Sequence, residues 1–571
     1  MDFEMSSESG AFRVAENGRI LFESGDCQLP EGVSASCETK ENELRIYVDP
    51  PVCEPMRQFG FPAAIIPEDS DILLIPHFEG FRIKADDISF PIPERLYASG
   101  TGLSMAFYGI LRRGYFLLCA IYTNLDADLL MEKRDGLFAP RVEWLPEKGK
   151  GGYRREIRYI AGKGGISELC AKYREIADEK GFRKTFDERA KENPGISRLV
   201  GAADVWLWND DAMDKLYSEN AVYHVPTKEQ NAERVRIARD MKEAGMDHVL
   251  WSVFDENVDK ATVDEVKKLG YLTTFYDIYT DVIPREIENL IPDTRRERCK
   301  PRRDCYPDGI MRNADGTMQK AWQLKGKDGE FHFQNRICDA AALERASKVV
   351  PEHSERYGLE GRFLDVQCVS AGECYDARHP MTRRTSFDYK RGLFEMLHEN
   401  KLVAGTEVGC EDAAAGFDYD EGMLSPVLAR QYDAGRRMTH IYEGGAIEPK
   451  IREIMLNPKY RVPLWELVYH GCVQSYWYWG DSANCMPELI RLRDKFCGLW
   501  GLPSIYSFKV SDWERLKPII TESYQRTTPS SRRLGSAAMT GFEWLDDEGL
   551  IQRTTFSDGT VITVDFSEDI G

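Results

Sequence analysis

The chain has 571 residues, which exceeds what one hydrophobic core usually organises, so two to four domains are expected. Its formal net charge of −20 repels phosphate backbones, which excludes nucleic acid as a natural partner. The sequence contains no run of about 20 apolar residues, so neither a membrane-spanning helix nor a membrane partner is expected.

The N-terminal residues and the cysteines predict the cellular compartment. The first ten residues are acidic and lack the apolar segment that a secretory signal needs. The 14 cysteines form no CxxC pair, and several of them fall in apolar segments, which is typical of reduced core thiols. We therefore expect a cytoplasmic protein.

Residues 1–165 predict an N-terminal β-sandwich. Short apolar runs alternate there with Gly and Pro, and a glycine-containing turn at 112–114 separates two strand-like runs. Residues 166–195 predict a linker helix, because Leu169, Tyr173 and Ile176 share one helical face and Gly181 can end the helix.

Residues 196–503 alternate between strand-like and helix-like runs, which predicts a (β/α)8 TIM-type barrel of parallel strands. The strand-like runs are 199–208, 247–254, 271–279, 361–369, 402–410, 439–443, 464–470 and 473–479. An irregular insertion over 281–335 interrupts the alternation. The expected fold class is therefore α/β, with the barrel between the sandwich and a small all-β C-terminal domain over 504–571.

Two of the apolar runs each carry one acid. Asp365 lies in GRFLDVQCV at 361–369, and Glu407 lies in LVAGTEVGC at 402–410. An acid inside an apolar strand is costly unless it is paired or used. Neighbouring strands lie about 5 Å apart, and two carboxylates roughly 5–5.5 Å apart suit retaining glycoside hydrolysis. The alternative is an ordinary ion pair inside the barrel.

The surroundings of the two acids suggest different roles. Apolar Ala404 and Val408 flank Glu407 and are expected to raise its pKa, which suits a general acid and base. We therefore expect Asp365 to be the nucleophile and Glu407 the acid/base. Other acids follow the same two strands and compete for a role as loop residues, with a surface position as the simpler interpretation for the last three: Glu373, Asp376, Glu411 and Asp412.

Aromatic and polar residues at the expected strand ends form a candidate sugar site. Sugars stack on aromatic rings while polar side chains bond their hydroxyls, although each aromatic taken singly is more often part of a core. The candidate substrate-binding residues are Trp208, Asn209, Trp251, Asp255, Asp277, Gln367, His470, Trp477, Trp479 and Asp481; Trp206, Tyr276 and Tyr478 extend the aromatic set.

Four segments resemble glycoside hydrolase family 129 and, more distantly, family 101. They are FLDVQ at 363–367, TEVG at 406–409, RVPLWELVYHGCVQSYWYWGDSAN at 461–484 and QRTTFSDGTVITVDF at 552–566. The resemblance implies a sandwich of the galactose-mutarotase type, a catalytic barrel and a small β-domain. It also matches Asp365 to the nucleophile and Glu407 to the acid/base. Gly471 departs from the YHD that often continues the motif at His470.

The resemblance implies a retaining exo-α-glycosidase that acts on terminal α-linked N-acetylgalactosamine or galactose, such as an O-glycan stub. The expected partner is this carbohydrate, and no metal or other cofactor is expected. Two alternatives stay open, namely a metal-dependent barrel hydrolase and a non-catalytic carbohydrate-binding protein on the same fold. The nine histidines form no HExxH or HxH motif, so a zinc site has no local signature. The sequence does not determine the oligomeric state.

Overall fold

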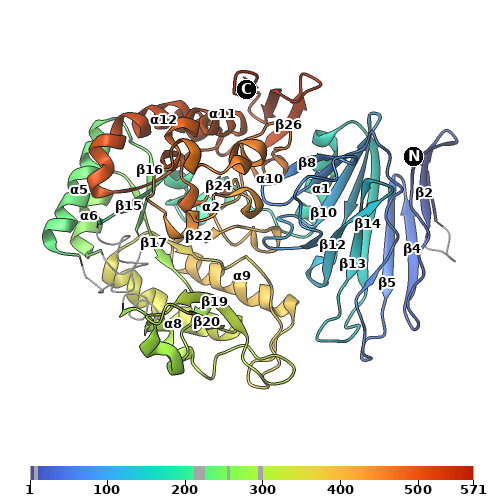
Figure 1. The fold of residues 1–571 in the computed structure, drawn as a ribbon, viewed down its shortest axis with the longest axis horizontal. Helices are drawn as coiled ribbons and strands as arrows, with labels where there is room; N and C mark the ends of the chain where they lie inside the picture. The colour runs from blue at the N-terminus through green and yellow to red at the C-terminus, as the bar shows by residue number, and fades with distance from the viewer. Residues whose placement is uncertain (1, 6–10, 211–225, 254–257, 294–299, 570–571) are drawn as a thin grey trace.

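The computed structural model describes residues 2–5, 11–210, 226–253, 258–293 and 300–569. A β-sandwich stands beside a barrel, and a small C-terminal sheet lies over the barrel's end near the sandwich (Figure 1). Within the described residues, no helix combines the length and apolarity that crossing a membrane requires.

Two facing antiparallel sheets form the sandwich, and a small three-stranded sheet lies beside them. The seven-stranded sheet has the order β4 (Ser34–Lys40), β5 (Glu43–Asp49), β14 (Arg155–Lys163), β11 (Tyr115–Ala120), β10 (Phe107–Arg112), β7 (Ile72–Ile75), β8 (Phe81–Lys84). The four-stranded sheet has the order β6 (Phe59–Gly60), β13 (Leu137–Trp144), β12 (Ala127–Arg134), β9 (Arg95–Tyr97). The third sheet is β1 (Asp2–Met5), β2 (Phe12–Glu16), β3 (Arg19–Glu23).

Three helices connect the sandwich to the barrel: α1 (Ile166–Glu179), α2 (Phe186–Glu192) and α3 (Ile196–Leu199). Leu169, Tyr173 and Ile176 are buried on α1, as their helical spacing predicted. They belong to a core that runs without interruption from sandwich residues such as Phe107 into the barrel. The sandwich and the barrel are therefore packed together rather than joined only by a linker.

Eight parallel strands form the nearly closed barrel, which confirms the predicted fold class. Their order is β24 (Gln474–Tyr476), β23 (Tyr419–Glu421), β22 (Val403–Glu407), β21 (Gly361–Leu364), β17 (Leu272–Asp277), β16 (Val249–Val253), β15 (Ala203–Trp208), β25 (Ile505–Lys509). The outer helices are α5 (Lys228–Glu243), α6 (Lys260–Lys268), α8 (Asp339–Tyr357), α9 (Arg383–Glu399), α10 (Leu464–Tyr469), α11 (Ile490–Trp500) and α12 (Trp513–Leu534). The first of them begins with the predicted capping box of Thr227 and Gln230.

The last barrel strands differ from the prediction. The sixth strand is the short β23, whereas 439–443 is not a strand and most of 464–470 is helix α10. A short apolar run buried on every side has no periodicity that separates strand from helix, which explains the error at 464–470. The eighth strand, β25, lies after the predicted barrel boundary at 503, so the barrel extends into the region assigned to the C-terminal domain.

Two small sheets complete the fold. The insertion expected to be irregular contains an antiparallel sheet of β18 (Asp281–Val282), β20 (Phe331–Arg336) and β19 (Lys320–Lys325), together with the 3-10 helices η2 (Arg285–Leu290) and η3 (Lys300–Cys305). The C-terminal meander is β26 (Met539–Trp544), β27 (Ile551–Phe556) and β28 (Val561–Asp565), as the turn residues between these strands predicted.

Candidate active site

Asp365 and Glu407 lie at the C-terminal ends of adjacent parallel strands. Leu364 of β21 pairs with Thr406 of β22, so the next residue on each strand is one of the two acids. Glu407 is the last residue of β22, and Asp365 directly follows β21, which places both at the mouth where (β/α)8 enzymes carry their chemistry.

The two carboxyl groups influence one another electrostatically from the ends of adjacent strands. Burial, and then the charge and hydrogen bond of Glu407, raise the pKa of Asp365 well above its ordinary value. The Tyr276 hydroxyl donates a 2.5 Å hydrogen bond to Asp365 Oδ2, which acts in the opposite direction. The sequence analysis had not predicted the raised pKa of Asp365.

Arg430 is a further charged group at the site. Its Nη1 lies 3.8 Å from Glu407 Oε1, and its guanidinium lies 4.0 Å from the centre of the Tyr478 ring. Its Nε donates a 2.6 Å hydrogen bond to the Ser425 carbonyl, which fixes the side chain. The sequence analysis missed Arg430, because it lies on a loop after β23 and no motif marks it.

The backbone is strained immediately after both acids. Val366 follows Asp365 with φ 50°, and Val408 follows Glu407 with φ 51°. A β-branched residue in the left-handed region is a true outlier that costs on the order of 1–3 kcal/mol. The same strain at the same position on two neighbouring strands turns each chain sharply at its acid.

An aromatic wall lines the interior beside the two acids. Trp206 and Trp208 both point into the barrel from β15, because side chains two residues apart lie on the same face of a strand. Their ring centres lie 5.8 Å apart. Trp479 packs on Trp206 at 4.8 Å and stacks on Tyr276 at 5.6 Å. Phe363 of β21 closes the group at 6.0 Å from Trp479.

A second carboxyl pair, Asp204 and Glu421, lies fully buried inside the barrel. Burial raises the pKa of Asp204 to about 7, and burial together with the charge of Asp204 raises the pKa of Glu421 well above its ordinary value. Ser252 Oγ donates to Asp204 at 2.6 Å, and Trp206 Nε1 donates to Glu421 at 3.2 Å. The sequence analysis missed this pair because its members lie 217 positions apart, from 204 to 421.

Four of the predicted substrate-binding residues are compatible with a role at the mouth. Trp208 and Trp479 belong to the aromatic wall. Asn209 follows β15 and Gln367 follows Asp365 by two residues, and both are buried. Asn209 Oδ1 and Gln367 Oε1 accept no hydrogen bond from the described residues.

Two predicted tryptophans lie outside the barrel interior. Trp251 packs in the apolar layer between the strands and helices such as α5 and α12, because it alternates with the inward Ser252. Trp477 Nε1 donates to Cys497 Sγ of α11 at 3.3 Å, and Arg493 covers its ring at 4.9 Å. Both predictions were wrong about the direction in which the side chain points.

Three predicted polar residues are held in structural contacts instead. Asp277 accepts 2.7 Å hydrogen bonds from Arg362 and Tyr279, and Asp481 forms a fully buried ion pair with Arg493 at 2.6 Å. The remaining residue, His470, contacts the Ala537 carbonyl through Nδ1 and packs against Phe556 of the C-terminal sheet. Asp255 lies outside the described residues.

The competing acids are tied into the protein. Glu411 accepts 2.7 Å hydrogen bonds from Tyr173, and Asp412 accepts from Ser99 at 2.6 Å. Asp376 accepts from Arg378 at 2.7 Å. All three are buried, so the predicted surface position was wrong. Glu373 also lies away from the carboxyl pair and accepts from the Lys148 backbone at 2.7 Å.

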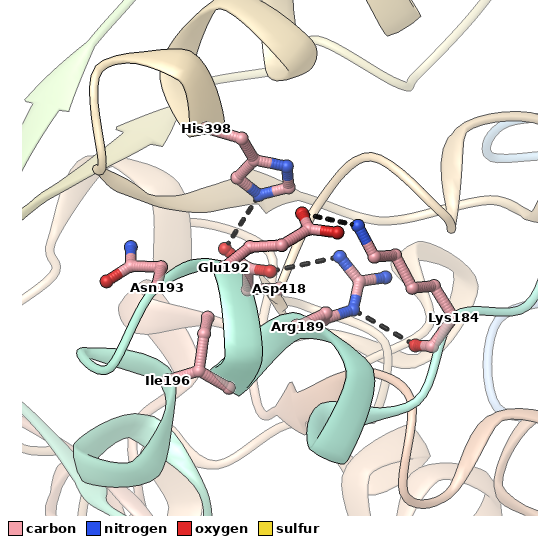
Figure 2. A pocket seen from close by; sticks show the side chains of 7 residues that line it. All are labelled: Lys184, Arg189, Glu192, Asn193, Ile196, His398 and Asp418. Atoms are coloured by element: carbon pink, nitrogen blue, oxygen red, sulfur yellow. Dashed lines mark hydrogen bonds and ion pairs between the residues drawn. The ribbon is translucent and has the colours of Figure 1, made fainter.

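A separate pocket lies where α2 meets the end of α9 (Figure 2). The buried Asp418 accepts from Arg189 and from His398, each at 3.0 Å, and also from the Ala404 backbone at 2.8 Å. These charges and hydrogen bonds lower the pKa of Asp418 despite its burial. Because every charged group at its base is already paired, this pocket is a structural ion-pair site that fixes the start of β22.

A barrel with two carboxyl groups at the ends of adjacent strands and an aromatic wall beside them is the arrangement with which glycoside hydrolases cleave sugar linkages. The family model of glycosyl hydrolases related to the GH101 family, GH129, matches residues 240–555, which is more than half of the chain. The chain therefore belongs to glycoside hydrolase family 129, and the resemblance seen in the sequence is confirmed.

Solved structures share the whole architecture. Ligand-free α-N-acetylgalactosaminidase NagBb from Bifidobacterium bifidum is 19% identical and has a TM-score of 0.72, with 99% of this chain and 98% of that chain covered. Its GalNAc complex is 18% identical with a TM-score of 0.72, covering 100% and 97%. At this identity the likeness establishes the fold. A comparison with curated protein sequences found no match.

Proposed function

We propose that this protein is a retaining exo-α-glycosidase that hydrolyses terminal α-linked N-acetylgalactosamine or galactose through a covalent glycosyl-enzyme. The observation that carries the proposal is the carboxyl pair, Asp365 and Glu407, at the ends of adjacent parallel strands. An inverting pair is separated by about 6.5–9.5 Å to admit a water, whereas neighbouring strands lie about 5 Å apart, close to the separation of about 5–5.5 Å in a retaining pair. The choice of sugar rests on the activity and the GalNAc ligand printed for NagBb.

The proposed reaction has two displacements at the anomeric carbon. Asp365 attacks that carbon while Glu407 gives its proton to the departing glycosidic oxygen, and the carbon–oxygen bond breaks. Glu407 then takes a proton from water, whose oxygen displaces Asp365 from the sugar. Two inversions return the α anomer. Trp208 and Trp479 would supply apolar surface for the sugar, and Asn209 and Gln367 would supply polar contacts.

The proposed roles require a proton movement within the carboxyl pair. In the free protein, burial and Glu407 favour the protonated form of Asp365. Catalysis needs the proton on Glu407, so a proton has to pass from Asp365 to its neighbour at the end of the adjacent strand before the sugar is attacked. The Tyr276 hydroxyl stabilises Asp365 once it is ionised, because a hydrogen bond donated to a carboxylate favours the charged form.

Substitution of each acid by alanine tests the two roles separately. With a nitrophenyl α-glycoside, we expect both variants to lose on the order of 10²–10⁴-fold in turnover without added nucleophile. Azide should rescue Asp365→Ala by direct displacement and yield a β-glycosyl azide. It should rescue Glu407→Ala by attacking the glycosyl-enzyme and yield an α-glycosyl azide. The opposite pairing of products would exchange the two roles.

The stereochemistry and the sugar are tested with the unaltered enzyme. Nitrophenyl α-glycosides of galactose, N-acetylgalactosamine, glucose and N-acetylglucosamine form the substrate panel, and proton NMR follows the first product anomer. We expect turnover of the first two sugars with the α anomer formed first. A first-formed β anomer would overturn the retaining mechanism, and turnover confined to the last two sugars would overturn the proposed specificity.

We also propose a cytoplasmic location. The cysteines in the described residues are free, including the exposed Cys37 and Cys53, and exposed thiols persist in reducing compartments. Fractionation of the native host with an antibody against the protein checks this, and recovery outside the cytoplasmic fraction would contradict it.

A further inference from the structure

Three metal-ligating side chains converge behind the loop that follows the strand of Asp365. Cys338 immediately precedes α8, while Cys374 and His379 lie on the loop between β21 and α9. One ligand atom from each of the three lies within 4.8 Å of the others. Both cysteines are fully buried beside Met311 and Met381. Cys374 lies 36 positions after Cys338 and 5 positions before His379. The three residues therefore form no local metal motif in the sequence.

The hydrogen bonds of His379 direct a lone pair toward the cysteines. Its Nε2 lies 2.8 Å from the Asp308 carbonyl oxygen, which can only accept, so Nε2 carries the hydrogen. Nδ1 therefore holds a lone pair, and it lies 3.3 Å from Cys374 Sγ. A metal-ligating histidine typically donates its other ring N–H to a carbonyl or carboxylate in this manner.

The Cys374 sulfur faces the histidine lone pair at a buried position. It also accepts a hydrogen bond from the Arg312 backbone N–H at 3.4 Å. A buried sulfur that faces a histidine lone pair presents two electron-pair donors to the same space, which a cation between them would satisfy.

We propose that Cys338, Cys374 and His379 bind a zinc ion. Tetrahedral zinc with thiolate and imidazole bonds of about 2.3 and 2.1 Å places sulfur and nitrogen roughly 3.6 Å apart, close to the 3.3 Å between Cys374 and His379. The fourth position falls to water or to Met381, whose Sδ lies 4.0 Å from Cys338 Sγ. Thiolate and imidazole donors select zinc over Mg²⁺ or Ca²⁺.

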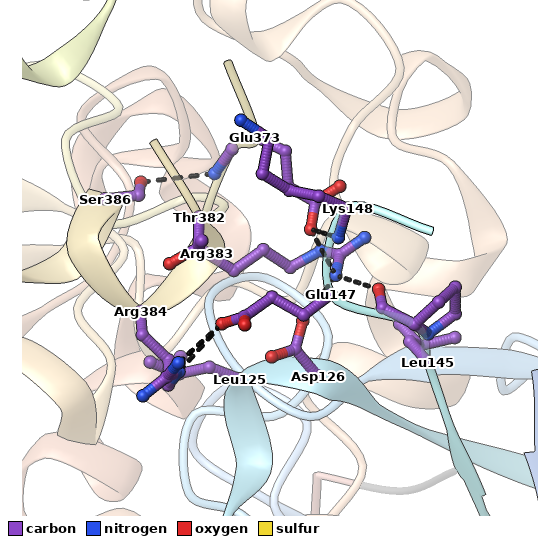
Figure 3. A network of polar contacts seen from close by, with 12 residues as sticks. Leu125, Asp126, Leu145, Glu147, Lys148, Glu373, Thr382, Arg383, Arg384 and Ser386 are labelled. Carbon is purple, nitrogen blue, oxygen red and sulfur yellow. Dashed lines mark hydrogen bonds and ion pairs between the residues drawn. The ribbon is translucent and has the colours of Figure 1, made fainter. Parts of the chain in front are cut away.

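The ion would stabilise the loop between β21 and α9, which already contacts the sandwich through Lys148. Figure 3 shows Glu373 beside Lys148 and Arg383; the Arg383 guanidinium lies 3.2 Å from Glu373 Oε1. Lys148 Nζ donates to the Cys374 carbonyl at 2.6 Å, so this contact ends at one of the zinc ligands. Zinc would join this loop to the start of α8 and would take no part in sugar cleavage. The inference is therefore independent of the proposed function.

Metal analysis of the full chain tests the site. The protein is expressed with added zinc, passed through a desalting column with a weak chelator, and analysed by inductively coupled plasma mass spectrometry. We expect about one zinc per chain, and zinc affinity on the order of 100-fold weaker in Cys374→Ser and in the partly exposed His379→Ala. Cys119→Ser, a buried cysteine of the sandwich beside Tyr108, is the matched control and should keep its zinc.

Two further measurements make the result decisive. Cobalt in place of zinc should give thiolate-to-cobalt charge transfer and visible d–d bands, and chelation should lower the thermal midpoint of the unaltered protein but not of Cys374→Ser. Unaltered protein that binds no zinc would overturn the proposal. So would full zinc retention by both ligand variants, or a Cys338–Cys374 disulfide found by mass spectrometry of the native protein.

Discussion

At the scale of single residues, one tyrosine decides how the proposed nucleophile behaves. Tyr276 stacks on Trp479, so its ring position is fixed, and its hydroxyl donates to Asp365. That bond lowers the pKa of Asp365 against the larger effects of burial and Glu407, which raise it. Tyr276 therefore favours an ionised nucleophile, and the charge of Arg302 acts in the same direction more weakly.

Tyr276→Phe should shift the pH profile of kcat/KM. Without the donated hydrogen bond the pKa of Asp365 rises further, so the acid limb of the profile should move to higher pH. We expect a loss on the order of 10-fold in kcat/KM at neutral pH, since one hydrogen bond to a charged group contributes about 1.5–3 kcal/mol. Tyr279→Phe is the control, because Tyr279 donates to Asp277 outside the site. Equal shifts in both variants would contradict the assignment.

At the scale of elements, the two strands that lead to Asp365 and Glu407 are followed by the same kind of turn. Each parallel strand places its acid at the mouth, and the following valine enters the left-handed region. This conformation is unfavourable for valine, so the surrounding packing must hold it.

Replacing Val366 with glycine should cost less stability than the same change nearby. Glycine adopts positive φ freely, so the loss of valine contacts is offset by relief of about 1–3 kcal/mol of strain. The matched control is Val369, which lies on the same loop and is also half-buried. Its φ is not in the left-handed region. We expect a higher thermal midpoint for Val366→Gly than for Val369→Gly. An equal drop in the midpoint of both variants would refute the strain argument.

At the scale of the whole molecule, buried acids join the sandwich to the barrel. Glu79 comes from the sandwich, Asp420 from β23 and Glu466 from α10, and all three are fully buried. Burial raises the pKa of Glu79 to about 8, against the opposing charge of Arg461. Burial and the neighbouring acids raise the pKa of Asp420 and Glu466 as well. The junction is thus stable with its carboxyl groups protonated.

Glu79→Gln should flatten the dependence of stability on pH. The folded state keeps a proton on Glu79 up to about pH 8, whereas the unfolded chain loses it near pH 4.5, so this contribution falls as pH rises between those values. The slope is at most about 1.4 kcal/mol per pH unit. Thermal midpoints across this range should converge at low pH and favour Glu79→Gln at pH 8. The exposed Glu31→Gln should track the unaltered protein, and parallel curves for Glu79→Gln would contradict the argument.

The sequence by itself determined the architecture and the neighbouring positions of the two acids. Alternating runs identified the sandwich, the parallel barrel and the final meander, because the periodicity of strands and helices follows from local geometry. The acids were visible because a carboxyl group is rare in an apolar strand, and strand order then placed Asp365 beside Glu407.

Only the tertiary structure decided which way side chains point and which distant groups meet. Trp251 lies within β16 and Trp477 directly follows β24, yet both face the helices, unlike Trp208 at the end of β15, because a shift of one residue reverses the side of a strand. Arg430 reaches Glu407, and Cys338 meets Cys374, through loops whose paths depend on packing over the whole chain. Such contacts are long-range, so no local pattern in the sequence records them.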